Sequence, residues 1–298
     1  MAKFLKTKVI VITSLARPAN LEDHQKLSSL IFLETHLHRH LDWRSPLEWL
    51  GDPFFWALEE GRQISAALAC PTEVDGIAWV RLFVFAGGWS AENAWNVLWP
   101  TAQSQIAQAG GARVAVIAMQ TWFQRILAES GFESPQRIVM LEWHGSASQP
   151  WARRSEAPSL RIRPMTEADL PAVQHVDAAS FEPIWQNSFE TLRRAFSQSL
   201  LATVAETETG ILGYQISTGS GQRAHLARLA VHPSFQGLGL GRALVQELLS
   251  SLVNNGIYKL SVNTQSDNIV SLRLYQRMGF IRTGEQYPVY IYDVPAAP

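Results

Sequence analysis

The chain of 298 residues is longer than one ordinary compact domain, and its 47% of hydrophobic residues is enough to bury two cores. A formal net charge of −1 argues against binding to nucleic acid or to an anionic membrane through bulk charge. Cys70 is the only cysteine, which excludes a disulfide framework and a thiolate zinc site. These properties fit a protein of the reducing cytoplasm.

The first residues, MAKFLKTKVIVITSL, combine lysines with an apolar run in the manner of a secretory signal. The uninterrupted run covers only residues 9–12, which is short for a signal core. We interpret it as a first β-strand of β-branched residues. Because no stretch approaches the length of a membrane span, we expect a soluble, cytoplasmic protein.

Three histidines, His36, His38 and His40, stand close together in HLHRHLDW. His36 and His40 would share one face of a helix, and a metal site is the alternative interpretation. No carboxylate or cysteine stands at metal-site spacing from them, so we expect a solvated helix and no metal. Nine of the eleven tryptophans precede residue 150, where they would fill a groove or form an interdomain surface.

The stretch HGSASQPWARRSEAPSL has the composition of a linker, which divides the chain into a domain at 1–143, a linker at 144–159 and a domain at 160–298. In the second domain the patterns predict strands over 160–165, 200–207, 210–218, 224–231, 259–265 and 287–293. They predict helices over 166–181, 189–198, 242–255 and 268–280. Thr166 is the expected cap of the first helix, and Gly256 ends the third.

The first half of the chain echoes the second. RLFVF at residues 81–85 matches RLAVH at 228–232, an offset of 147 residues, and GARVAVIAM aligns with GIYKLSVNT. Such a repeat indicates two copies of one fold. The offset places Glu92 opposite Gly239, Ala94 opposite Gly241 and, one residue further on, Leu127 opposite Tyr275. The first copy is therefore expected to be degenerate.

FQGLGLGRALV, which spans residues 235–245, places three glycines before a helix. Glycine is favoured where a backbone turns sharply or approaches a ligand, and a helix N-terminus attracts phosphate. The spacing G-x-G-x-G fits neither the dinucleotide fingerprint G-x-G-x-x-G nor a Walker loop, which needs Lys and Ser or Thr after the last glycine. The remaining pattern is Q-x-x-G-x-G.

Two segments in the expected order resemble the GNAT superfamily of N-acetyltransferases: RLAVHPSFQGLGLGRALV and NTQSDNIVSLRLYQRMGF. The resemblance covers roughly residues 160–293, with the first half as a degenerate copy. It implies an α/β fold of two GNAT-like domains, each with a mixed, mostly antiparallel central sheet flanked by helices. It also implies acetyl-CoA as co-substrate. The residues that would bind it are Leu229, Ala230, Val231, Gln236, Gly237, Leu238, Gly239, Leu240, Gly241, Arg242, Asn268 and Tyr275.

In the family, the tyrosine that matches Tyr275 lies near the CoA sulfur and protonates the leaving thiolate. Packing of its ring in a helix–sheet core is the alternative. The base is less clearly indicated. The position of the glutamate that some members use corresponds to about His225, whose imidazole titrates near neutrality. Glu182, in the connection between the first two helices of the second domain, is the rival.

The sequence thus predicts an acetyltransferase that transfers acetyl from acetyl-CoA to a primary amine by direct attack in a ternary complex. The acceptor would be a small molecule or a peptide N-terminus. The alternative is a CoA-binding sensor or scaffold without turnover. The sequence does not identify the acceptor, and it leaves a homodimer open.

Overall fold

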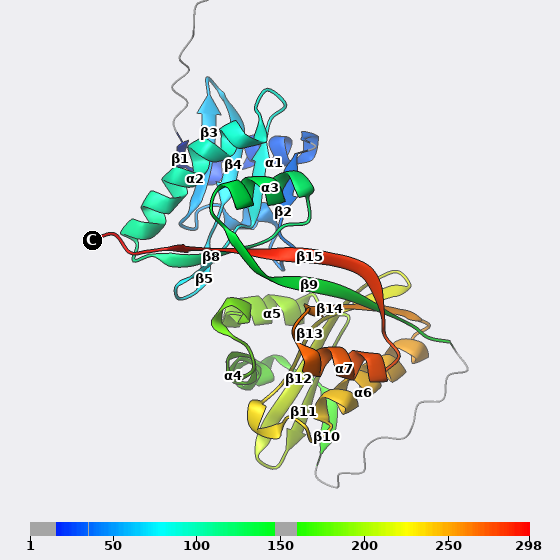
Figure 1. Ribbon diagram of the computed structural model, residues 1–298. Helices are drawn as coiled ribbons and strands as arrows, with labels where there is room; N and C mark the ends of the chain where they lie inside the picture. The colour runs from blue at the N-terminus through cyan, green and yellow to red at the C-terminus, as the bar shows by residue number, and fades with distance from the viewer. Residues whose placement is uncertain (1–15, 35, 147–159) are drawn as a thin grey trace, which may run out of the picture.

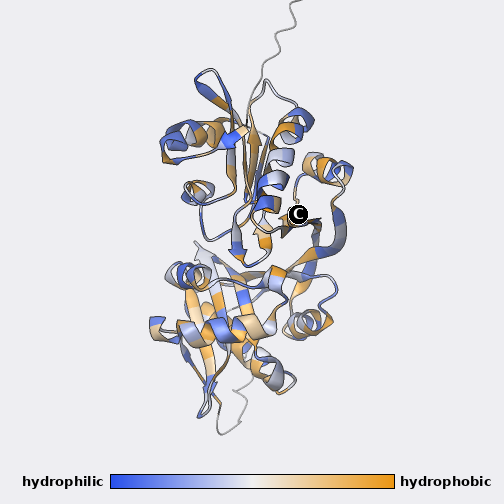
Figure 2. Cartoon of the chain, turned by 90° about the vertical axis from the view of Figure 1, so that its left-hand side faces the viewer, coloured by the Kyte–Doolittle hydropathy of each residue, from blue (hydrophilic) through white to orange (hydrophobic). Residues whose placement is uncertain are grey.

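The computed structural model describes residues 16–34, 36–146 and 160–298 (Figure 1). The strand expected at 9–12 and most of the expected linker lie outside these ranges. Two halves of mixed α/β structure are stacked on each other, and hydrophobic residues are concentrated on the strands inside each half (Figure 2). None of the helices in the described ranges is long and apolar enough to cross a membrane.

The first half contains a five-stranded sheet in the order β1-β3-β4-β7-β2. Its strands are β1 (Ala16–Pro18), β3 (Phe55–Glu60), β4 (Gln63–Ala69), β7 (Leu82–Phe85) and β2 (Leu37–Arg39). The helices of this half are α1 (His24–Leu33), α2 (Ala91–Gln108) and α3 (Thr121–Glu129), with short 3-10 turns η1 (Leu21–Asp23) and η2 (Pro46–Trp49). Trp56, Trp95 and Trp99 pack in the core of this half.

The second sheet has ten strands in the order β10-β11-β12-β13-β14-β9-β15-β8-β6-β5. These are β10 (Arg161–Pro164), β11 (Leu201–Thr207), β12 (Gly210–Ser220), β13 (Arg223–Val231), β14 (Lys259–Gln265), β9 (Glu133–His144), β15 (Ile281–Val294), β8 (Ala112–Ile117), β6 (Ile77–Trp79) and β5 (Thr72–Val74). Helices α4 (Leu170–Ser180) and α5 (Phe189–Ser197) cover one face of the C-terminal part, and α6 (Leu240–Asn254) and α7 (Ile269–Arg277) cover the other (Figure 1). Short 3-10 turns are η3 (Glu167–Asp169), η4 (Pro183–Trp185) and η5 (Pro233–Phe235).

The two halves exchange their last strands. β9, which ends the first half, pairs with β14 of the second half along residues 259–265. β15, which ends the second half, pairs with β8 of the first, and β9 and β15 pair with each other (Figure 1). The ten-stranded sheet therefore contains strands from both sides of residue 143.

The duplication extends further than the sequence repeat. In the first half, the Arg17 guanidinium binds the carboxylates of Asp23 at 2.7 Å and Glu59 at 2.9 Å. In the second half, Arg163 binds Asp169 at 2.7 Å and Glu206 at 2.8 Å, at equivalent positions. The parallel pairing of β6 with β8 likewise repeats that of β13 with β14. The expected fold of two related α/β domains is confirmed.

The expectation of a solvated histidine helix is wrong. Residues 37–39 form strand β2, in which the His38 side chain is completely buried. The three histidines alternate at the two-residue period of a strand. The middle one, His38, is buried in the core, whereas the expected helix would have exposed it to solvent. Within the described ranges, no group of three or more His, Cys, Asp or Glu side chains is arranged to hold a metal ion.

Candidate acyl-transfer site

Strands β13 and β14 separate halfway along their length. They pair in parallel only between residues 223–226 and 259–262. At the same point β13 has a bulge against β12: Ser217 pairs with Leu226, Ile216 pairs with Arg228, and Ala227 is left over. Beyond the bulge, Leu229, Ala230 and Val231 pair only with β12. This strand therefore has an open edge to which an extended ligand can add, as a further strand would.

The glycine loop lies at the end of that open strand and leads into α6. Gly237 and Gly239 have φ angles of +79° and +87°, which side chains strongly disfavour, and a Cβ on either would point into open space. The backbone N–H groups of residues 237–242 donate to no other described residue. Gly239 caps α6, so these donors gather at the positive end of the helix dipole. The arrangement suits a phosphate or pyrophosphate group.

Two of the expected cofactor-binding side chains also hold the local structure. The Gln236 amide donates to the Val231 carbonyl at 2.9 Å and ties the loop to the end of β13. Ser180 donates to the same carbonyl at 3.0 Å, so this oxygen is already engaged. The Asn268 side chain caps α7 by accepting from the Ser271 N–H at 3.0 Å. Its amide nitrogen makes no hydrogen bond to a described residue and stays available to a ligand.

Tyr275 lies on α7 with only 4% of its surface exposed, in the core between α6, α7 and β14. Its ring packs against Phe280 at 5.4 Å between centroids. Burial raises the pKa of the phenol above its ordinary value, so the group stays protonated near neutral pH. The hydroxyl makes no hydrogen bond to a residue within the described ranges, and its role as an acid stays a prediction.

The two candidate bases have different surroundings. His225 is partly buried on β13 where that strand still pairs with β14, and its Nδ1 lies 2.9 Å from the Ser261 hydroxyl. Burial lowers the pKa of His225 below its ordinary value of 6.5. Glu182 is exposed at the start of η4, and its carboxylate makes no hydrogen bond or ion pair with a described residue. Both assignments stay predictions.

Sequence reasoning missed a buried cluster beside the bulge. Arg228 donates to Asp177 of α4 at 2.8 Å and to the Trp185 carbonyl at 2.6 Å. The Tyr214 hydroxyl donates to the same carboxylate, and the Asn187 N–H donates to it at 2.9 Å. Asp177 is completely buried, so removal of either charged partner would leave an expensive unpaired charge. This cluster fixes the η4 connection against β13. The repeat RLFVF/RLAVH pointed to Arg228, but its partners lie far away in the sequence.

The equivalent groove of the first half is closed by the chain itself. β2 pairs with β7 along residues 82–84, the counterpart of the open edge of β13. At the helix start, Ser90 accepts from the Asn93 N–H at 3.1 Å, and Glu92 in the first turn binds Arg125. Leu127, the counterpart of Tyr275, is completely buried and has no acidic proton. Among the described residues, β7 therefore lacks the open edge that β13 has, and the start of α2 carries a side-chain cap.

Comparison with known proteins agrees with this geometry. Residues 170–280 match the profile of the acetyltransferase (GNAT) family. A GCN5-related N-acetyltransferase from Sphaerobacter thermophilus superposes with a TM-score of 0.61 at 16% identity over 95% of this chain and 96% of that one. A tandem GNAT protein from the clavulanic acid biosynthesis pathway gives 0.64 at 13% over 95% and 99%. A GCN5-related N-acetyltransferase from Kribbella flavida gives 0.63 at 13% over 94% and 71%. At these identities the structural likeness shows a shared fold.

The glycine loop and the sheet that opens beside it both lie within the matched residues. Residues 170–280 match the GNAT family, and the chain shares its overall fold with a tandem GNAT protein.

Proposed function

We propose that the C-terminal half transfers an acetyl group from acetyl-CoA to a primary amine, on a small molecule or at a peptide N-terminus. The proposal rests on two neighbouring features. One is the open edge of β13, and the other is the set of backbone N–H groups of residues 237–242 that have no acceptor. The open edge suits the amide-bearing pantetheine arm, and the loop suits the pyrophosphate. The two features lie end to end along one strand, as the two parts of coenzyme A require.

The reaction follows from the groups around the groove. The neutral amine attacks the thioester carbonyl, a C–N bond forms and the C–S bond breaks. The thiolate takes the Tyr275 proton, and the base takes the proton that the amine nitrogen loses. Cys70, the only cysteine, is completely buried in the core of the first half, so no cysteine is placed to carry the acetyl group. The transfer is therefore direct.

We expect His225→Gln to lower kcat/KM about 100-fold if the imidazole is the base. Because its pKa is lowered, the imidazole is neutral at pH 7 and becomes protonated only at a pH below 6.5. In the wild type, kcat/KM corrected for the fraction of neutral amine should therefore hold between pH 7 and 6.5 and fall at lower pH, and the variant should lose this limb. Glu182→Gln is the matched comparison. A loss confined to Glu182→Gln would assign the base to that carboxylate instead.

The experiment that tests the function is a thiol-release assay with acetyl-CoA against small amines and peptides with free N-termini. Release that depends on one amine class supports acetyl transfer to that class. If acetyl-CoA binds but no amine in the panel releases thiol, the transferase proposal fails and a CoA-binding sensor is favoured.

A further inference from the structure

A cavity lies between the two halves, next to the strand that carries the proposed acyl site. Its walls include His40, Trp79 and Arg81 from the first half and Ile184, Trp185 and Arg228 from the second. Arg228 follows the β13 bulge directly and borders the open edge. Trp185 and Ile184 belong to η4, which the Arg228–Asp177 cluster holds in place. The cavity is therefore fixed relative to the end of the groove where an acetyl group would lie.

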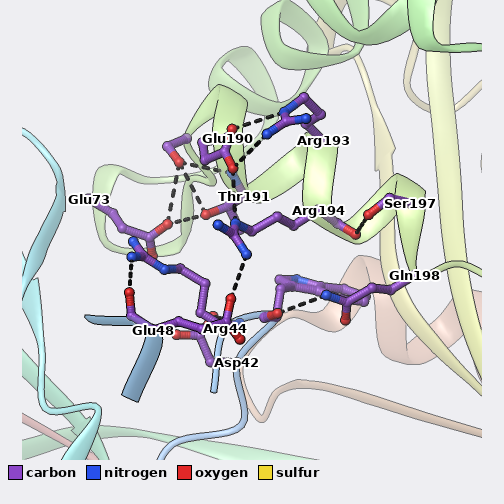
Figure 3. Close-up of polar contacts among 12 residues, drawn as sticks. Asp42, Arg44, Glu48, Glu73, Glu190, Thr191, Arg193, Arg194, Ser197 and Gln198 are labelled. Carbon is purple, nitrogen blue, oxygen red and sulfur yellow. Dashed lines mark hydrogen bonds and ion pairs between the residues drawn. The ribbon is translucent and has the colours of Figure 1, made fainter. Parts of the chain in front are cut away.

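Polar contacts join the two halves at and beside the cavity. Glu73 of the first half accepts from Thr191 of α5, and Arg194 of α5 binds Glu48 at 2.7 Å (Figure 3). Gln198 donates to the Trp43 carbonyl at 3.0 Å, also across the halves. The first half thus forms a wall of the cavity.

The cavity walls contain buried polar atoms without partners. Arg81 is only 6% exposed, and its Nε makes no hydrogen bond, although its terminal nitrogens bind Glu73 and, at 3.4 Å, Asp42. The indole Nε1 of Trp185 is buried and also unpaired. Both atoms are obligatory N–H donors, and a buried donor without an acceptor is costly. The Nδ1 of His40 is a third unpaired atom in the same walls.

These atoms surround one aromatic ring. The Trp79 ring lies 5.5 Å from the Trp185 ring and 4.9 Å from the His40 ring, between centroids. The guanidinium carbon of Arg81 lies 6.0 Å from the centroid of Trp79. The Nη1 of Arg228, in the opposite wall, makes no hydrogen bond to a described residue. The unpaired donors therefore belong to residues that line the same cavity, and a ligand with hydrogen-bond-accepting oxygens would suit them.

We propose that this cavity binds the acceptor amine and selects amines that carry a carboxylate or carboxamide oxygen for the donors of Arg81 and Trp185. This inference rests on the proposed acetyl transfer. The carboxylates of Asp42 and Glu73 are already paired with Arg81, so they do not compete for the free N–H groups. The aromatic walls contact the apolar part of the ligand, while its amine points toward β13.

The test uses the full chain and three matched families of amines with two to four carbons: unbranched amino acids such as glycine and 4-aminobutanoate, their carboxamides, and plain alkylamines. Binding to the CoA-saturated protein is measured by calorimetry, and turnover is measured separately by thiol release. We expect the oxygen-bearing amines to bind at least about tenfold more tightly than alkylamines, as one satisfied buried donor implies. The amino acid and carboxamide arms show which oxygen group is preferred.

Trp185→Phe keeps the aromatic contact with Trp79 and removes only the indole N–H. It should weaken binding of the oxygen-bearing amines about tenfold and leave the alkylamines unchanged. Trp89→Phe removes an indole N–H that donates to Glu60 outside the cavity walls, and serves as control. The inference is overturned if the wild type binds all three amine families equally. It is also overturned if Trp185→Phe weakens binding of all three families equally, or of none of them. Selective binding without thiol release would uphold this cavity and reject acetyl transfer.

Discussion

Gly239→Glu should weaken acetyl-CoA binding at least about 100-fold and reduce kcat/KM accordingly. Gly239 has a φ of +87° and caps α6, so a side chain there both strains the loop and lies at the gathered N–H groups. A hydrogen bond from such a donor to a charged phosphate contributes about 1.5–3 kcal/mol, so loss of two already exceeds a 100-fold change. The carboxylate would also repel the pyrophosphate. The measurement is calorimetric titration with acetyl-CoA.

The matched control is Gly256→Glu, just beyond the other end of α6. Gly256 has a φ of +74° and also open space around a would-be Cβ, so the substitution brings a comparable backbone strain and the same charge. It lies far along the helix from the unpaired N–H groups. If both variants lose acetyl-CoA affinity to a comparable extent, the loss is due to backbone strain. If Gly239→Glu binds acetyl-CoA as tightly as wild type, the loop is not the phosphate site.

Tyr275→Phe should lower kcat about 100- to 1,000-fold while the affinity for acetyl-CoA stays within about twofold of wild type. The raised pKa keeps the phenol protonated and ready to donate as the thiolate leaves. Because the hydroxyl makes no hydrogen bond within the described ranges, its removal should not change the thermal midpoint of unfolding. The measurements are steady-state kinetics and a melting curve of the same preparation. A kcat equal to that of wild type would leave the tyrosine as a core residue only.

Much of the second half could be predicted from its sequence because local signals there agree. The strand expected at 259–265 coincides with β14, and α7 lies within the predicted range. Two of the three loop glycines, Gly237 and Gly239, have the left-handed backbone of a sharp turn, whereas Gly241 lies in the first turn of α6. The expected cap at Thr166 is formed too, as a capping box with Asp169. It opens the 3-10 turn η3, and α4 begins after that turn.

Long-range features could not be read in the same way. β9 and β15 occupy equivalent places in the repeat, so their periodicity fits the neighbouring strand of either half equally well. Only three-dimensional packing selects the exchanged pairing. The cavity between the halves depends on Arg81 and Trp185, which are more than 100 residues apart, and no local pattern joins them. The histidines of β2 did carry a two-residue period, but its short length made the helical interpretation competitive.

The asymmetry of the two halves is the central claim of this account, and a calorimetric titration of the wild-type chain with acetyl-CoA tests it most directly. One copy has an open strand edge and a helix start without a side-chain cap, whereas β2 and Ser90 close the other. One molecule of acetyl-CoA should bind per chain, and its affinity should fall at least about 100-fold in Gly239→Glu. Two molecules per chain, or an affinity in the variant equal to that of wild type, would contradict the claim.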